Sequence, residues 1–185
     1  MSAARVTPLR SRREAGRTNL DERVEAVLRR EASGLLAYFQ RRVRPTEDAA
    51  DLLSETMTVA WRRAEILPSD DDQARMWLYG VARNTLSSHR RGQMRRDALA
   101  DQLRSELAVG DGAVGLHGRE RDSRVDELRD LVRALPEQDR EIFALHVWEG
   151  FPLVQVAEML ELPAGTVRSR YSRARAFLRA QLDPS

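Results

Sequence analysis

Apolar residues recur along most of the chain at steps of three and four positions, the spacing of one face of an α-helix. The clearest case is the segment 21–43, whose apolar face consists of Val24, Val27, Leu28, Leu35, Leu36, Phe39 and Val43. Segments 46–66 and 74–91 show the same periodicity. No segment sustains the alternation of a β-strand, so the sequence predicts an all-α protein.

Prolines and polar residues set the expected ends of these helices. Pro45 ends the first, and Thr46 is expected to cap the second, whose first turn holds Glu47 and Asp48. Carboxylates are favourable there because the N-terminal end of a helix dipole is positive. The polar residues 66–73 predict a turn before the third helix.

A segment without helical periodicity interrupts the second half of the chain. Residues 97–124 contain four glycines and few large apolar residues after Leu107, which predicts a partly disordered linker. Helical periodicity returns at 125–135, and a further helix is expected over 137–149, between Pro136 and Gly150. Two further helices are expected over 152–160 and 164–182.

The pattern therefore predicts two small all-helical domains joined by a flexible linker. The N-terminal domain is expected over residues 21–96 and the C-terminal domain over 125–185, with the linker at 97–124 and a disordered basic tail at 1–20. A chain of 185 residues is long enough for two small cores.

Composition excludes several classes of protein. No run of 18 apolar residues occurs, and residues 1–20 lack the apolar stretch of a secretory signal, so we expect a cytoplasmic protein without membrane insertion. The absence of cysteine excludes disulfides and thiolate metal sites. The three histidines, His89, His117 and His146, are scattered and lack carboxylates at ligand spacing. We expect no cofactor, no metal and no enzymatic activity.

The charge distribution is more informative than the net charge of +2. All 31 basic residues are arginine, and residues 163–182 contain five of them without a single acidic residue. Such a patch attracts phosphates or acidic partners.

The last two expected helices have the lengths and short connection of a helix-turn-helix. On a helical wheel of 164–182, Ser169 and Ser172 lie opposite the apolar stripe, and Arg168 and Arg173 flank them. Small hydroxyl residues allow close approach to DNA, and arginine can bind guanine or phosphate with two hydrogen bonds. The alternative interpretation is an ordinary solvated helix rich in arginine.

The sequence of this segment is similar to that of a known family. Residues 163–170 (PAGTVRSR) and 173–175 (RAR) resemble the promoter-reading helix of the extracytoplasmic-function (ECF) sigma factors of bacterial RNA polymerase, in group 4 of the sigma-70 family. Residues 135–141 and 156–160 resemble the rest of that module. The resemblance implies that the −35 promoter element is contacted by Thr166, Arg168, Ser169, Arg170, Ser172, Arg173 and Arg175.

Residues 49–57 and 60–62 resemble the family's polymerase-binding segment. The resemblance implies that Asp51, Ser54 and Glu55 contact the clamp helices of the largest subunit of core RNA polymerase, with the second-largest subunit as a further contact. Asp51 and Glu55 are four residues apart and share one helix face. A solvated acidic face is the alternative. The family usually has an amide residue where this chain has Ser54, and an aromatic residue where it has Met57. We expect Met57 to fill the core.

Residues 76–84 resemble the helix that holds the melted −10 element in this family. Trp77, Asn84, Ser88 and Arg91 share one flank of that helix and combine an aromatic, an amide and a cation, a set suited to single-stranded DNA. For Trp77 the alternative is a place in the core. By resemblance, residues 65–75 form the specificity loop, although the acids at 70–72 are unexpected for a DNA contact.

The resemblance implies a promoter-specificity subunit that binds core RNA polymerase and promoter DNA, associates with the nucleoid in holoenzyme, and has an anti-sigma factor as a further partner. Glu161 departs from the family's pattern, because the family usually has glycine at the turn between the helices expected over 152–160 and 164–182. The competing hypothesis is a conventional helix-turn-helix regulator with a helical sensor domain. That hypothesis explains residues 152–182 but leaves 51–57 and 77–84 unexplained.

Overall fold

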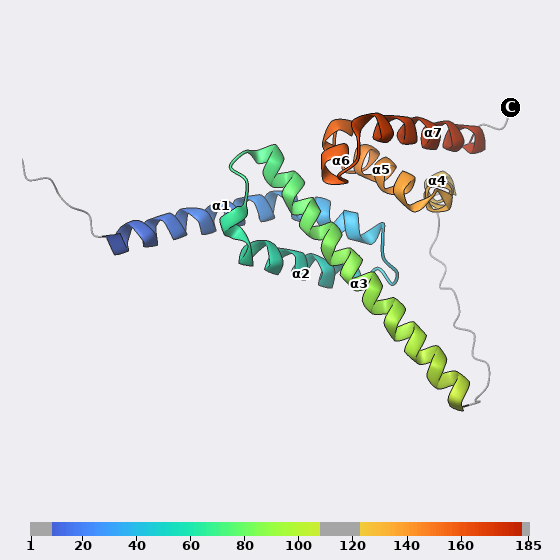
Figure 1. Ribbon diagram of the computed structural model, residues 1–185, viewed down its shortest axis with the longest axis horizontal. Helices are drawn as coiled ribbons and strands as arrows, with labels where there is room; N and C mark the ends of the chain where they lie inside the picture. The colour runs from blue at the N-terminus through green and yellow to red at the C-terminus, as the bar shows by residue number, and fades with distance from the viewer. Residues whose placement is uncertain (1–8, 108–122, 183–185) are drawn as a thin grey trace, which may run out of the picture. The chain divides into compact units, whose positions relative to one another are not determined.

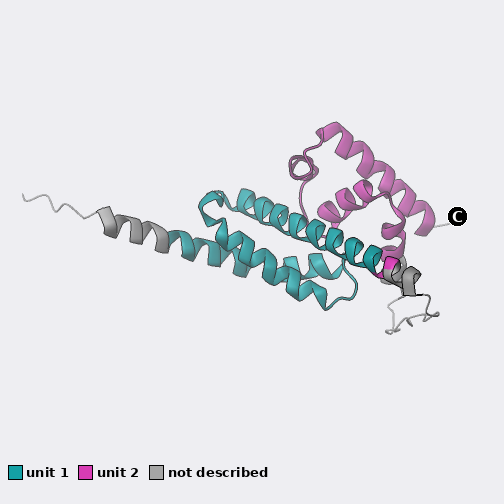
Figure 2. Ribbon diagram, turned by 60° about the horizontal axis from the view of Figure 1, so that its bottom comes forward, with its two compact units in different colours: residues 1–99 teal, residues 100–185 magenta. Residues whose placement is uncertain are grey.

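The computed structural model describes residues 9–107 and 123–182. These residues form seven α-helices and one short 3₁₀ helix, with no β-strand among them (Figure 1). The predicted all-α class is therefore confirmed. The chain divides into two compact units, residues 1–99 and 100–185 (Figure 2). Within the described parts, no helix is both long and apolar enough to cross a membrane.

The first unit is built from α1 (Leu9–Gln40), α2 (Asp48–Arg62), the 3₁₀ helix η1 (Ala64–Ile66) and the part of α3 (Asp71–Leu107) up to residue 99. The apolar faces of these helices meet in a core, whose largest fully buried side chains include Tyr38, Phe39 and Tyr79. The ring of Tyr38 meets those of Phe39 and Tyr79 edge-on, at centroid distances of 5.3 and 5.7 Å. Gly34 leaves room for this cluster, because a Cβ there would lie 2.7 Å from the Tyr79 hydroxyl.

The start of α1 corrects one expectation. Residues 1–20 were expected to form a disordered tail, but α1 begins at Leu9, and residues 1–8 lie outside the described part. After Pro8 the sequence has no helix breaker stronger than Gly16, and arginine, alanine, glutamate and leucine favour helix. A helix started in the core can continue through such residues without an apolar face of its own.

The end of α3 corrects a second expectation. The linker was predicted to begin at residue 97, but α3 continues through Asp97 to Leu107. Residues 97–107 lack glycine and proline and are rich in alanine, leucine and glutamate, so their helix propensity is high even though their apolar periodicity is weak. The glycine-rich part of the expected linker falls in 108–122, outside the described residues, and 123–124 already belong to α4.

The start of α2 corrects a third expectation. Thr46 was expected to cap this helix, but the N-cap position is occupied by Glu47, and no side chain caps the helix there. The carbonyl of Thr46 already accepts a hydrogen bond from the amide of Ala49 at 3.1 Å. Thr46 and Glu47 thus form a turn, and α2 begins one residue later than the sequence indicated. At its other end α2 stops at Arg62, and η1 completes the segment expected as one helix to residue 66.

The second unit consists of α4 (Ser123–Ala134), α5 (Glu137–Val147), α6 (Leu153–Met159) and α7 (Ala164–Leu182). Its core contains Val132, Leu135, Phe143, Ala174 and Leu178, with Leu128, Leu131, Trp148 and Tyr171 packed against it. The stripe predicted for the last helix is confirmed: its residues at 167, 174 and 178 are buried, and the one at 171 is half-buried. This packing fixes which face of α7 remains outside.

Candidate nucleic-acid interface

The outer face of α7 carries most of the residues predicted to contact the −35 element. Five of them are exposed: Arg168, Ser169, Ser172, Arg173 and Arg175. The hydroxyl of Ser169 donates to the carbonyl of Thr166 at 3.0 Å, which leaves its oxygen lone pairs on the exposed face free to accept. Thr166 is half-buried at the start of the helix. The face is therefore small, polar and flanked by guanidinium groups.

Arg170 is set apart from this exposed group. Its side chain is half-buried, and Nη1 donates to Oδ1 of Asp139 in the first turn of α5 at 2.8 Å. Arg170 therefore joins α7 to α5 across 31 residues of sequence. On a helical wheel Arg170 lies near the apolar stripe, but nothing in the sequence identified Asp139 as its partner.

The four residues of α3 that are predicted to bind DNA lie on one side of that helix. Asn84, Ser88 and Arg91 are exposed, and Trp77 is half-buried. Arg91 lies along the helix, with Nη1 donating to Oγ of Ser87 at 2.7 Å and Nη2 donating to Oγ of Ser88 at 3.1 Å. The burial of Trp77 is intermediate between the two expectations, a place in the core and an exposed aromatic.

The acidic face of α2 lies opposite its buried face. Asp51, Ser54 and Glu55 are exposed, whereas Leu52 and Thr56 are buried. The hydroxyl of Ser54 donates to the carbonyl of Ala50 one turn earlier at 3.0 Å. The two carboxylates of this face are thus available to a basic partner. Met57 is only half-buried, so it lines the edge of the core and does not fill it.

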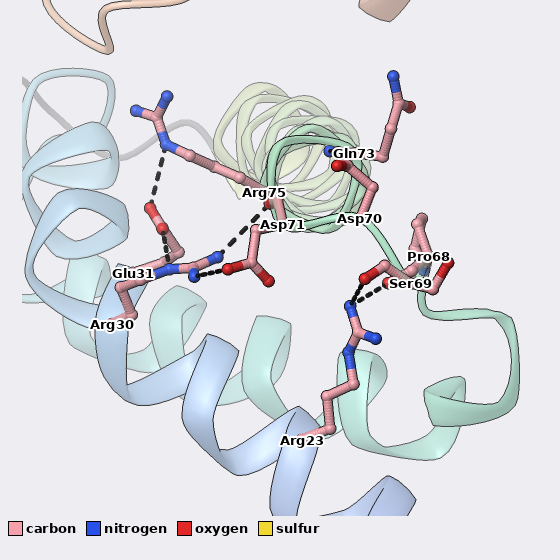
Figure 3. Close-up of polar contacts among 9 residues, drawn as sticks. All are labelled: Arg23, Arg30, Glu31, Pro68, Ser69, Asp70, Asp71, Gln73 and Arg75. Atoms are coloured by element: carbon pink, nitrogen blue, oxygen red, sulfur yellow. Dashed lines mark hydrogen bonds and ion pairs between the residues drawn. The ribbon is translucent and has the colours of Figure 1, made fainter.

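The three adjacent acids at the start of α3 have different surroundings, which the sequence did not show. Figure 3 shows the contacts of Asp70 and Asp71. Asp70 caps α3, because its Oδ1 accepts from the amide of Gln73 at 2.9 Å. Asp71 accepts from Nη1 of Arg30 on α1 at 2.8 Å, and this hydrogen bond raises the pKa of Arg30. Asp72 is exposed. Two of the three acids thus have contacts that stabilise the fold.

The histidines do not assemble a metal site in the described part of the chain, where no group of three potential ligands occurs. His89 lies beside α2, with Nε2 at 3.4 Å from Oδ2 of Asp48. His146 is bound locally, with Nδ1 at 2.8 Å from the carbonyl oxygen of Phe151. His117 lies outside the described residues.

The second unit thus has the arrangement of a helix-turn-helix with a basic, serine-bearing outer face. Comparison with known proteins finds matches for both units of the chain. The family model described as Sigma-70 region 2 matches residues 27–96, and the model described as Sigma-70, region 4 matches residues 126–178. The ECF RNA polymerase sigma-E factor of Haemophilus influenzae is 30% identical over 161 residues, covering 82% of this chain and 82% of that protein.

Two solved structures have a similar fold. The sigma factor RpoE of Bartonella quintana, in complex with the anti-sigma factor NepR, matches with a TM-score of 0.62 and 23% identity over 89% of this chain and 96% of that one. CnrH, in complex with the cytosolic domain of CnrY, matches with a TM-score of 0.59 and 22% identity over 88% of each chain.

The chain therefore belongs to the ECF family of RNA polymerase sigma factors. It directs promoter-specific initiation of transcription, and its partners are core RNA polymerase and promoter DNA. The hypothesis of a conventional helix-turn-helix regulator is not favoured, because it gives no reason for a sigma region 2 in the first unit.

Proposed function

We propose that the two faces described above are the promoter-reading surfaces of this sigma factor. The C-terminal domain, expected over 125–185, reads the −35 element, and the N-terminal domain, expected over 21–96, binds polymerase and opens the −10 element. The observation that carries the proposal is the exposed face of α7, where Ser169 and Ser172 lie between Arg168 and Arg173.

The chemistry of the α7 face fits a major groove. The two serines carry little bulk, so the helix backbone can approach the bases, and the flanking guanidinium groups can bind guanine or phosphate. We assign Arg168, Ser169, Ser172 and Arg173 to base edges, and Thr166 and Arg175 to positions nearer the DNA backbone. Arg170 acts through Asp139 to hold α7 in place, which supports a positioning role in DNA recognition.

The flank of α3 is suited to the melted −10 strand. The half-buried indole of Trp77 offers a rigid edge for stacking, and Asn84 and Ser88 offer exposed hydrogen-bonding groups. Arg91 supplies the positive charge. We assign these four residues to the −10 element, together with the specificity loop over residues 65–75.

The exposed acids of α2 are suited to the clamp helices of the polymerase's largest subunit. Asp51 and Glu55 present two carboxylates on one face, and Ser54 lies between them. Charge-assisted hydrogen bonds to arginine or lysine would fix the orientation of the domain. A contact with the second-largest subunit belongs to the same proposal.

The protein's regulation and location are part of this proposal. The two solved structures named above are complexes, one with the anti-sigma factor NepR and one with the cytosolic domain of CnrY. We infer that this chain too is held by an anti-sigma factor. We also propose that it has no catalytic activity of its own and acts in the cytoplasm, associated with the nucleoid in holoenzyme.

Run-off transcription with purified core polymerase tests the assignment of α7. We expect Arg173→Ala to weaken dependence on the −35 sequence by about 1–3 kcal/mol, the usual contribution of one arginine–base contact. Arg179→Ala is the control, because Arg179 is also exposed on α7 but lies near its C-terminal end. Unchanged −35 dependence in the Arg173→Ala holoenzyme would remove Arg173 from the site.

A further inference from the structure

The loop between η1 and α3, residues 67–70, is attached to α1 by a single arginine. Nη2 of Arg23 donates to the carbonyl oxygens of Pro68 and Ser69, at 2.5 and 2.6 Å. Figure 3 shows the side chain of Arg23 extending from α1 to these two adjacent carbonyls. The contact spans 45 and 46 residues of sequence, so it is purely tertiary.

The contact fixes the path of the loop backbone. Because both acceptors are carbonyl oxygens, the attachment does not depend on which side chains the loop carries. A charged donor also makes stronger hydrogen bonds than a neutral one. The side chains of Ser69 and Asp70 remain exposed, so the loop is held through its backbone while it presents polar side chains to the outside.

A second attachment holds the chain just after the loop. Nη1 of Arg30 donates to Asp71, and Nε of the same residue donates to Oε1 of Glu31 at 3.0 Å. The other oxygen of Glu31 accepts from Nε of Arg75 on α3 at 3.2 Å. Glu31 is only 9% exposed, so its carboxylate is poorly screened by solvent and stays between the two arginines.

One attachment lies within the loop, and the other lies directly after it. Arg23 holds its backbone before α3 begins, and the network of Arg30, Glu31, Asp71 and Arg75 holds the first turn of α3. Trp77 follows on the same helix. The position of the loop relative to the indole is therefore set from α1.

We infer that Arg23 is a positioning residue for promoter recognition, which fixes the loop 67–70 in the one conformation that discriminates among −10 sequences. The inference rests on the proposed function, in which this loop faces the −10 element. Without Arg23 the backbone of residues 67–69 would sample several paths, and each would present Ser69 differently, whereas Asp70 stays bound to the amide of Gln73 at the start of α3. Discrimination among bases would then fall even though the rest of the domain stays folded.

A purely structural role predicts a different result. If Arg23 only stabilised the domain, its removal would reduce polymerase binding, −10 dependence and −35 dependence together. A positioning role predicts loss of −10 discrimination alone. The ratio of open-complex formation on the preferred promoter to that on promoters with single −10 substitutions separates the two roles.

The experiment uses reconstituted holoenzyme containing the full chain. For Arg23→Ala we expect the discrimination ratio to fall by about tenfold, because two charge-assisted hydrogen bonds are lost. Arg23→Lys keeps one charged donor and should recover part of the ratio. Arg29→Ala is the matched control: Arg29 is an exposed arginine of the same helix whose ion pair, with Glu25, lies within α1.

The outcomes are distinct. A lower ratio for Arg23→Ala, with polymerase affinity and −35 dependence retained, supports the inference. An unchanged ratio, or a parallel loss of all three properties in both Arg23→Ala and Arg23→Lys, overturns it. If the wild-type holoenzyme itself does not depend on the −10 sequence, the proposed function fails before the variants are considered.

Discussion

At the scale of single residues, the turn between α6 and α7 has a backbone conformation that its side chain disfavours. Glu161 has a φ of 55°. The amide of Glu161 donates to the carbonyl of Glu158 at 3.1 Å, and that of Leu162 to Ala157 at 2.9 Å. This pair of hydrogen bonds is the Schellman arrangement, in which glycine usually occupies the left-handed position.

We predict that Glu161→Gly stabilises the protein by about 1 kcal/mol, the cost of the left-handed conformation for a residue with a Cβ. Thermal or urea unfolding of the full chain measures the change. Glu158→Gly is the control: the same replacement inside α6 should destabilise by about 1 kcal/mol, because Glu158 has no such conformational constraint. A lower unfolding midpoint for Glu161→Gly would contradict the prediction.

The same position shows what sequence can and cannot provide at this scale. The resemblance showed that Glu161 stands where the family usually has glycine, and the structure shows the positive φ that glycine adopts more readily. The roles of Asp70 and Asp71 were not visible, because their charge alone suggested repulsion of DNA. Their partners, the amide of Gln73 and the side chain of Arg30, became identifiable only once the fold brought them together.

At the scale of helices, the recognition helix depends on one contact with a neighbouring helix in addition to its apolar stripe. Arg170 of α7 and Asp139 of α5 are joined at 2.8 Å, with side chains 31% and 13% exposed. Since both groups are largely withdrawn from water, removal of either one leaves the other poorly solvated. The pair therefore affects how firmly α7 is held.

We predict a coupling free energy of about 1–2 kcal/mol between Arg170→Ala and Asp139→Ala in a double-mutant cycle of unfolding. Each single variant should lose stability, and the double variant should lose less than the sum. Arg168→Ala is the control, since Arg168 is exposed on the same helix and should leave stability within about 0.5 kcal/mol of wild type. Additive effects would show that the pair contributes nothing to the packing of α7.

Helix existence was predictable from sequence, but several helix ends were not. The apolar stripe of α7 follows directly from periodicity, and its buried positions agree with it. The ends of α1 and α3 were misplaced because a helix can continue without an apolar face when no proline intervenes, as over residues 9–20 and 97–107. The hydrogen bonds from Arg23 to the loop could not be predicted from the sequence either, because their acceptors are backbone carbonyls, which every residue carries.

At the scale of the whole molecule, the proposed function is divided between the two units. Each has its own core and its own exposed polar face, so a surface substitution in one need not affect the other. Promoter specificity nevertheless requires both, since a sigma factor reads DNA while bound to polymerase. The acidic face of α2 should therefore control every promoter-dependent property, although it contacts no DNA in this proposal.

We predict that Asp51→Arg lowers affinity for core polymerase by at least about tenfold, because it places a positive charge against a basic partner surface. Intrinsic binding of the full chain to −35 duplex should stay unchanged, since α7 belongs to the other unit. Fluorescence anisotropy with labelled polymerase and labelled duplex measures the two affinities separately. Glu22→Arg, which makes the same charge change at an exposed position of α1, controls for net charge. Should Asp51→Arg assemble into holoenzyme as well as Glu22→Arg does, the acidic face of α2 is not the polymerase contact, and another surface of the first unit must anchor the protein.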